Sequence, residues 1–190
     1  MKIQEIKARE IFDSRGNPTV ECEINIEGID YPFRGLVPSG ASTGKFEALE
    51  LRDGDKDRMS GKGVLKAVYN VNEILKPQLI SREFLNYEEF DNFMINLDGT
   101  PNKSKFGANA ILSLSLAFYK AWSYANHKSV FLSQGDSNLL IPVPMLNVIN
   151  GGQHADNDVD FQEFMILPIG FSSLKDALSA THSVITNIKK

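Results

Sequence analysis

The chain has 190 residues, of which 42% are hydrophobic and 23% charged, which is enough for one domain or for a domain and part of another. Lys and Arg number 20 against 24 Asp and Glu, and the net charge of −4 argues against a general nucleic-acid-binding surface. The single cysteine, Cys22, excludes an internal disulfide framework and favours a reducing compartment. The N-terminus lacks the apolar run of a secretory signal, and the most apolar stretch, 108–125, is short of the about 20 residues of a membrane span.

The first part of the chain has the alternating pattern of antiparallel strands. From Val20 to Ile26, apolar and polar residues alternate, which predicts a strand with one buried face and one face in water. A turn around Gly28 leads into a returning strand over 31–37, and residues 3–12 predict a third strand. Cys22 falls on the apolar face, where we expect an inert small hydrophobic side chain.

The pattern then becomes helical. Apolar residues between Val64 and Leu75 recur at helical spacing, and we expect Pro77 to end this helix. Residues 87–97 predict a second short helix. The stretch 108–125 is apolar on nearly every face, which predicts a helix enclosed by its neighbours. Strands followed by helices indicate an α+β domain.

A polar segment at 133–138 is the best boundary candidate, and we expect one domain over residues 1–136 and a second part over 137–190. In this second part, residues 142–149 and 164–169 predict two strands. A helix is expected from Ser172 onward, with Ser172 or Ser173 as its N-cap.

One glycine-rich loop invites a phosphate-binding interpretation. Gly40 and Gly44 are separated by three residues rather than the four of a Walker loop, and Phe46 follows Lys45 where Ser or Thr is required. The segment therefore does not predict an NTPase. A hydroxyl-rich loop can instead close over a charged ligand, and a serine oxygen can join the shell of a hard cation. An ordinary surface loop is the alternative.

The second candidate site lies between the two later strands. Their link, residues 150–161, has no helical pattern, so the strands are expected to run antiparallel and to share one rim. His154, Gln162 and Glu163 can meet there. A histidine and a carboxylate beside a mobile loop suit acid–base chemistry on an anion. The alternative is a polar hairpin tip with solvated acids.

Five segments together resemble the enolase family, and they follow one another in the family's order. The similarity runs from about Ile3 to Pro168. The segments are Asp13–Glu21, Val37–Gly44, Lys105–Leu112, Asn147–Ala155 and Gln162–Ile166.

The resemblance implies an α+β N-terminal capping domain, a three-stranded antiparallel sheet plus helices, followed by the start of an incomplete α/β (TIM-like) barrel. It implies a lyase, phosphopyruvate hydratase, that uses Mg²⁺ to interconvert 2-phosphoglycerate and phosphoenolpyruvate in glycolysis. The family is cytoplasmic, and some of its members are also found at the cell surface or secreted.

The resemblance also implies roles for four residues. Ser42 corresponds to a ligand of the second, catalytic Mg²⁺. His154 belongs to a closing loop near the substrate phosphate and counts as catalytic and substrate-binding. Gln162 contacts the substrate. Glu163, catalytic and substrate-binding, helps to position the water or hydroxyl that leaves.

A complete barrel takes about 250 residues, whereas only residues 137–190 are available for it here. By resemblance, the general base, the general acid and the main metal ligands belong to the rest of the barrel, so we expect this chain to be truncated and inactive alone. Enolases form homodimers, with Arg15 and Glu21 near the interface, and we expect nonspecific association instead. Two alternatives stay open. One is a non-catalytic fragment that binds a partner or has no function. The other is a sugar- or organic-acid-processing relative from the wider superfamily, although such relatives as a rule do not have the loop found here at 39–44.

Overall fold

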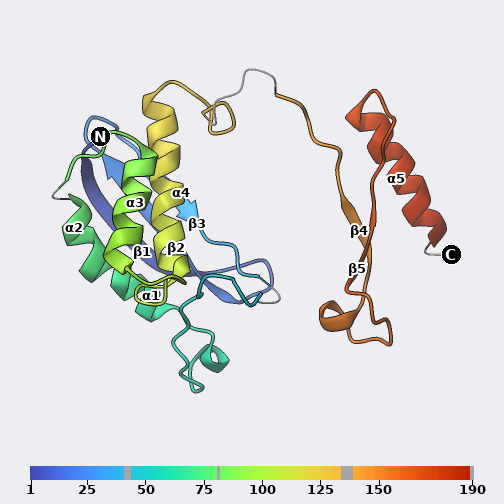
Figure 1. The fold of residues 1–190 in the computed structure, drawn as a ribbon, viewed down its shortest axis with the longest axis horizontal. Helices are drawn as coiled ribbons and strands as arrows, with labels where there is room; N and C mark the ends of the chain where they lie inside the picture. The colour runs from blue at the N-terminus through green and yellow to red at the C-terminus, as the bar shows by residue number, and fades with distance from the viewer. Residues whose placement is uncertain (41–43, 81, 134–138, 189–190) are drawn as a thin grey trace. The chain divides into compact units, whose positions relative to one another are not determined.

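The computed structural model describes residues 1–40, 44–80, 82–133 and 139–188, with the side chain of Gln153 excepted. The chain divides into two compact units, residues 1–135 and 136–190, and each is described by itself. The first unit contains a sheet with helices against it, and the second contains a strand pair and one long helix (Figure 1).

The first unit begins with a three-stranded antiparallel sheet in the order β1-β2-β3, as the alternating pattern predicted. The strands are β1 (Ile3–Phe12), β2 (Pro18–Ile26) and β3 (Phe33–Leu36). Cys22 is completely buried within β2. Burial raises the pKa of its thiol to about 12, which leaves it protonated and inert, as expected.

The other face of the sheet is less exposed than the alternation predicted. Glu21 is only 7% exposed. Arg9 on β1 lies 3.4 Å from a carboxylate oxygen of Glu21 and also contacts Glu23, while Arg34 on β3 reaches Glu23 at 2.8 Å. The expected face in water is therefore only partly exposed: Glu21 is buried, Glu23 and Asn25 are half-buried, and the ion pairs run across the strands.

The helix expected to end at Pro77 continues beyond it. It consists of α1 (Leu65–Tyr69), a π-helical turn η2 (Asn70–Leu75) and α2 (Lys76–Ile80). A proline inside an α-helix has no N–H, and its ring clashes with a carbonyl four residues earlier. Here the wider turn comes directly before the proline, and the Lys76 N–H donates to the Val71 carbonyl, five residues back. The expectation was wrong because this turn re-spaces the carbonyls ahead of Pro77.

The short 3-10 turn η1 (Met59–Gly61) precedes α1. Two further helices complete the first unit. Asn86 caps α3 (Tyr87–Asp98) by accepting the Glu89 N–H at 2.8 Å, and Gly99, at φ 68°, ends it. The helix α4 (Ala108–Ala125) has the predicted bounds. Its enclosure is incomplete, since Leu112 is 40% and Tyr124 50% exposed.

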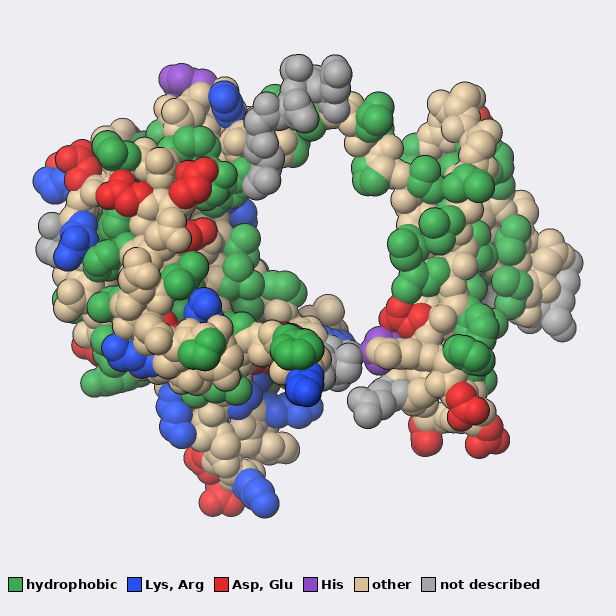
Figure 2. All heavy atoms as spheres, viewed as in Figure 1, with side chains coloured by type: hydrophobic (Ala, Val, Ile, Leu, Met, Phe, Trp, Pro, Cys, Tyr) green, Lys and Arg blue, Asp and Glu red, His purple; other side chains and the backbone are tan. Residues whose placement is uncertain are grey.

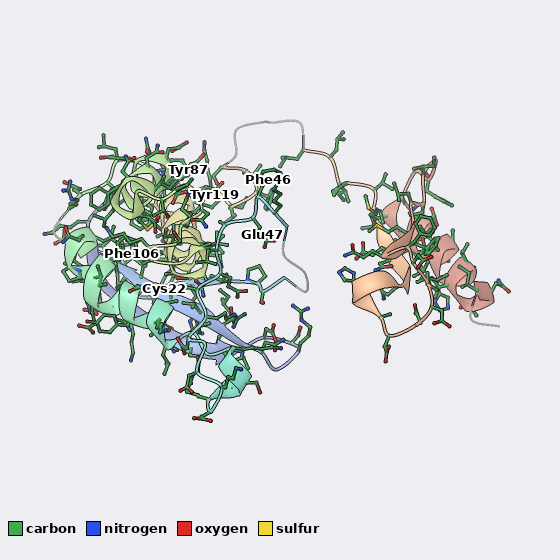
Figure 3. All side chains as sticks on the ribbon, turned by 60° about the horizontal axis from the view of Figure 1, so that its bottom comes forward. Cys22, Phe46, Glu47, Tyr87, Phe106 and Tyr119 are labelled. Carbon is green, nitrogen blue, oxygen red and sulfur yellow. The ribbon has the colours of Figure 1, made fainter. Side chains whose placement is uncertain are left out.

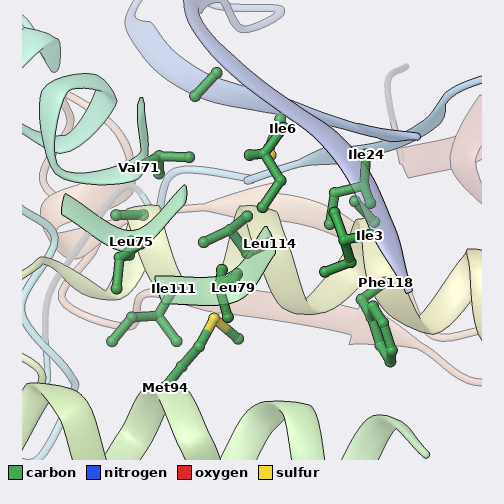
Figure 4. Close-up of a cluster of buried hydrophobic side chains, with 14 of the residues drawn as sticks. Ile3, Ile6, Ile24, Val71, Leu75, Leu79, Met94, Ile111, Leu114 and Phe118 are labelled. Atoms are coloured by element: carbon green, nitrogen blue, oxygen red, sulfur yellow. The ribbon is translucent and has the colours of Figure 1, made fainter. Parts of the chain in front are cut away.

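The core lies between the sheet and these helices (Figure 4). Leu114 and Phe118 of α4 point into it together with Ile3, Ile6 and Ile24 from the sheet. Phe118 stacks on Phe90 of α3 with ring centroids 4.1 Å apart. Helices α3 and α4 are thereby fixed to one another and to β2 and β3.

A half-buried carboxylate fixes the segment that leads into α1. Glu10, on β1, accepts hydrogen bonds from Arg58 and, at 2.8 Å, from the Val64 N–H. These bonds, with Arg58 as the largest cause, hold the pKa of Glu10 below its ordinary value of 4.5. Because that pKa is lowered on folding, the stabilisation is complete well above pH 4.5 and is lost as the pH falls through the folded-state pKa.

We therefore expect Glu10→Gln to lower the free energy of unfolding by about 1–3 kcal/mol at pH 7, since Arg58 loses its charged acceptor. The difference from the unchanged protein should shrink below pH 4. Urea unfolding followed by the fluorescence of the single tryptophan, Trp122, at pH 7 and pH 3.5 measures both values. A difference that is the same at the two pH values would contradict this account.

The second unit contains an antiparallel strand pair, β4 (Leu146–Asn150) and β5 (Glu163–Ile166), as the loop argument predicted, although both strands are shorter than expected. The 3-10 turn η3 (Gly152–His154) lies at the end of this hairpin (Figure 1). The helix α5 (Leu174–Ile188) follows, and its cap is Ser173, which accepts the Asp176 N–H at 3.1 Å. The described residues form no closed barrel.

Many apolar side chains of the second unit are exposed to solvent (Figure 2). The largest exposed fractions are those of Leu140 (90%), Ile141 (76%), Ile169 (74%) and Phe161 (71%). In α5 only Ala177 and Thr181 are buried. Over the part of the chain that the structure describes, no helix is both long and apolar enough to cross a membrane.

Candidate functional site at the end of the β4–β5 hairpin

The candidate site forms where β4 ends and β5 begins. Asn150, the last residue of β4, is paired with Glu163, the first residue of β5. The register shifts between Asn147 and Ile149, which marks a bulge one residue before the end of the strand pair. The antiparallel arrangement therefore brings both ends of the 151–162 loop to one edge.

Main-chain hydrogen bonds close this loop tightly. The Gly151 N–H donates to the Gln162 carbonyl at 3.0 Å, and the Gly152 N–H donates to the Val159 carbonyl at 2.7 Å. A Cβ atom on Gly151 would lie 2.5 Å from the carbonyl oxygens of Phe161 and Val159, so no larger residue fits there. The His154 N–H then donates to the Gly151 carbonyl at 3.0 Å, which turns the chain back over the strand ends.

The three side chains singled out in the sequence meet at this edge. The Nδ1 atom of His154 lies 3.0 Å from a carboxylate oxygen of Glu163. The amide nitrogen of Gln162 lies 2.7 Å from the Nε2 atom of His154 and 3.5 Å from its Nδ1 atom. This arrangement fits an imidazole that carries its proton on Nδ1 and donates it to Glu163, while Nε2 accepts a hydrogen bond from Gln162.

The cluster is accessible to a ligand and offers it hydrogen-bonding groups. The side chains of His154 and Glu163 are 19% and 30% exposed, so water or a substrate can reach them. A carboxylate that accepts a hydrogen bond from a histidine is held in a fixed orientation and keeps further lone pairs for a hydroxyl or water. The edge can therefore offer hydrogen bonds to a polar ligand.

The first candidate loop is described only in part. Ser42, the expected metal ligand, lies outside the described residues. From Gly44 onward the chain is described again. The Gly44 N–H donates to the Glu47 carboxylate at 2.8 Å, and the side chain of Phe46 is 94% exposed. Figure 3 shows Phe46 and Glu47, which belong to the turn in which the Glu47 N–H donates to the Gly44 carbonyl at 3.2 Å.

The described residues show no ready-made cluster of metal-ligating side chains. Within the described ranges, no group of three or more His, Cys, Asp or Glu side chains is placed to hold a metal ion. A hard cation such as Mg²⁺ requires near-octahedral oxygen coordination, in proteins through one or two carboxylates plus waters and substrate oxygens.

Asn157, which the sequence did not single out, also shapes the site. Its side chain donates to the Asn150 carbonyl at 3.0 Å and accepts the Val159 N–H at 3.1 Å. The available sequence signal was weak: an asparagine in a loop often accepts the N–H two residues later in an Asx turn.

The two residues expected near a dimer interface lie in the first unit, where Arg15 donates to the Ser39 carbonyl at 2.5 Å and Glu21 contacts Arg9.

Two family models match this chain in succession. The model described as "Enolase, N-terminal domain" matches residues 3–133, which is more than half of the chain. The model described as "Enolase, C-terminal TIM barrel domain" matches residues 138–190 and so includes the whole β4–β5 edge.

Proposed function

The chain belongs to the enolase family, and from this premise we propose that it serves the reversible dehydration of 2-phosphoglycerate to phosphoenolpyruvate, a lyase reaction of glycolysis in the cytoplasm. The observation that carries the proposal is the contact of His154 with both Gln162 and Glu163 at the edge of the β4–β5 hairpin. This edge lies within the part of the chain that matches the family's barrel.

In the proposed reaction, a proton leaves the carbon next to the substrate carboxylate and the neighbouring carbon loses its hydroxyl group as water. Glu163 accepts a hydrogen bond from that departing hydroxyl or water. His154 holds Glu163 in place through Nδ1 and lies near the substrate phosphate when the loop closes. Gln162 contacts the substrate through its amide. These roles agree with the exposure of the cluster and its mutual hydrogen bonds.

The remaining chemistry requires groups that the described residues do not supply. The family uses Mg²⁺, which stabilises negative charge that develops on the substrate carboxylate. We propose that Ser42 contributes one ligand to a second Mg²⁺ and that the main ligands and the general base come from further barrel residues. The 190-residue polypeptide is then inactive by itself.

We further propose that residues 1–136 form the capping domain and residues 137–190 form the first strands and first helix of a barrel. The exposed apolar residues of the second unit are consistent with a surface that further barrel strands cover. The homodimer of the family requires barrel surface opposite Arg15 and Glu21, so the polypeptide alone associates nonspecifically.

The alternative function is that of a non-catalytic binding module, for which the exposed apolar side chains of the second unit offer a surface. The two functions differ in whether the β4–β5 edge takes part in turnover once a barrel is complete.

The proposed function predicts a modest effect for Gln162→Ala. In an enzyme that joins residues 1–190 to the rest of a family barrel, we expect kcat/KM for 2-phosphoglycerate to fall about two- to tenfold, the value of one hydrogen bond. The assay follows the ultraviolet absorbance of the enol-phosphate product. Gln4→Ala, at an exposed position of β1, is the matched control and should leave kcat/KM unchanged. Equal rates in both variants would count against the proposal.

A further inference from the structure

We infer that Asn157 is a positioning residue, which holds the 151–162 loop closed and thereby sets His154 against Gln162 and Glu163. The inference deepens the proposed function and rests on it for the role of those three side chains. Asn157 itself contacts none of them through the hydrogen bonds of its side chain, which go to the main chain.

The amide of Asn157 joins two parts of the loop that are far apart along it. Its nitrogen donates to the carbonyl of Asn150, the last residue of β4, at 3.0 Å. Its oxygen accepts the N–H of Val159, which leads into β5, at 3.1 Å. One side chain thus connects the outgoing strand to the returning segment.

A short series of bonds links this amide to the imidazole. Val159, whose N–H is held by Asn157, accepts the Gly152 N–H on its carbonyl at 2.7 Å. Gly152 is the first residue of the turn η3, and His154 is the last. A displacement of Val159 therefore moves the turn that carries the imidazole, and the 2.7 Å and 3.0 Å contacts of His154 depend on that turn.

The chemistry requires an amide at this position. A carboxylate can still accept the Val159 N–H, but it has no proton for the Asn150 carbonyl and places a negative charge beside that oxygen. Asp156, Asp158 and Asp160 already surround the position in sequence, so a fourth acid adds repulsion. Alanine keeps neither bond. The two substitutions therefore separate the donor bond from the acceptor bond.

The test measures the tautomer of His154 in the 190-residue chain without substrate. At pH 8 an ordinary imidazole is neutral, and long-range ¹H–¹⁵N spectra distinguish protonation at Nδ1 from protonation at Nε2. The signal is assigned by its loss in His154→Gln. We expect the Nδ1–H form to dominate in the unchanged chain. It should lose that dominance in Asn157→Ala, and its fraction should fall partway in Asn157→Asp.

Asn126→Ala is the matched control, because Asn126 makes the same kind of side-chain bond, to the Trp122 carbonyl at 2.8 Å, at the end of α4 in the other unit. It should leave the His154 spectrum unchanged. If Asn157→Ala keeps the Nδ1–H form while the amide signals of β4 and β5 are unaltered, the inference is overturned. If Asn157→Ala disrupts the hairpin, Asn157→Asp decides: an unchanged His154 spectrum in this variant overturns the inference, and a partial change supports it.

Failure of the inference and failure of the proposed function are distinguishable. The tautomer is read without substrate, metal or turnover, so a shift in Asn157→Ala supports positioning even if Gln162→Ala has no effect in the barrel-completed enzyme. Conversely, an unchanged tautomer in Asn157→Ala together with a lower kcat/KM in Gln162→Ala leaves the proposed function standing and removes Asn157 from it.

Discussion

Gly35→Ala should destabilise the first unit by about 3 kcal/mol or more, the upper end of the usual cost of overpacking. Gly35 lies on β3, where the sheet approaches α4 closely. A Cβ atom on it would lie 1.9 Å from the Ser113 carbonyl oxygen and 2.8 Å from the Ala117 nitrogen. Both atoms belong to the main chain of α4, so no side-chain rotation relieves the clash, and strand and helix must move apart.

The sign of this effect is informative because a glycine-to-alanine change at an unstrained position stabilises a protein by about 0.4–1 kcal/mol through the unfolded state. Gly44→Ala is the matched control, since the nearest atom to its added Cβ is the Glu47 carboxylate at 4.0 Å. Urea unfolding followed by Trp122 fluorescence measures both variants. Equal midpoints for the two would show that α4 does not press on β3 as described.

The sheet was predictable from the sequence because its signal is local. Alternation from Val20 to Ile26 reflects the two faces of one strand, and it is typical of a strand that packs one face on the core. The burial of Glu21 was not predictable, because it depends on neighbours from other strands, among them Arg9 of β1. The continuation of the helix through Pro77 was not predictable either, because it requires a π-helical turn. The close packing at Gly35 was also not predictable, because its neighbours Ser113 and Ala117 are 78 and 82 residues away in sequence.

The site was predictable to a similar extent. A link without helical pattern implied antiparallel strands, and antiparallel strands bring His154 and Glu163 to one edge. The pairing of each imidazole nitrogen depends on the exact path of the loop, which the spacing of residues does not encode. Asn157 was missed for the same reason, since its partners are main-chain groups that have no signature in the sequence.

We propose that this chain supplies one edge of an enolase active site and that further barrel residues supply the rest. General acid–base groups typically contribute about 10²–10⁴-fold to a rate, and a metal ion adds several kcal/mol of charge stabilisation. Within the described ranges the His154 cluster provides hydrogen bonds and orientation, but no three-ligand metal group accompanies it. Loss of both contributions together should leave no measurable dehydration.

The most direct measurement is the dehydration of 2-phosphoglycerate by the purified 190-residue polypeptide with Mg²⁺ present, followed by the ultraviolet absorbance of the enol-phosphate double bond. The account predicts no turnover above background for the polypeptide alone and turnover once residues 1–190 are joined to the rest of a family barrel. Turnover by the 190 residues alone that survives repurification and disappears in Glu163→Gln would contradict it, because the base and the metal ligands would then lie within this chain.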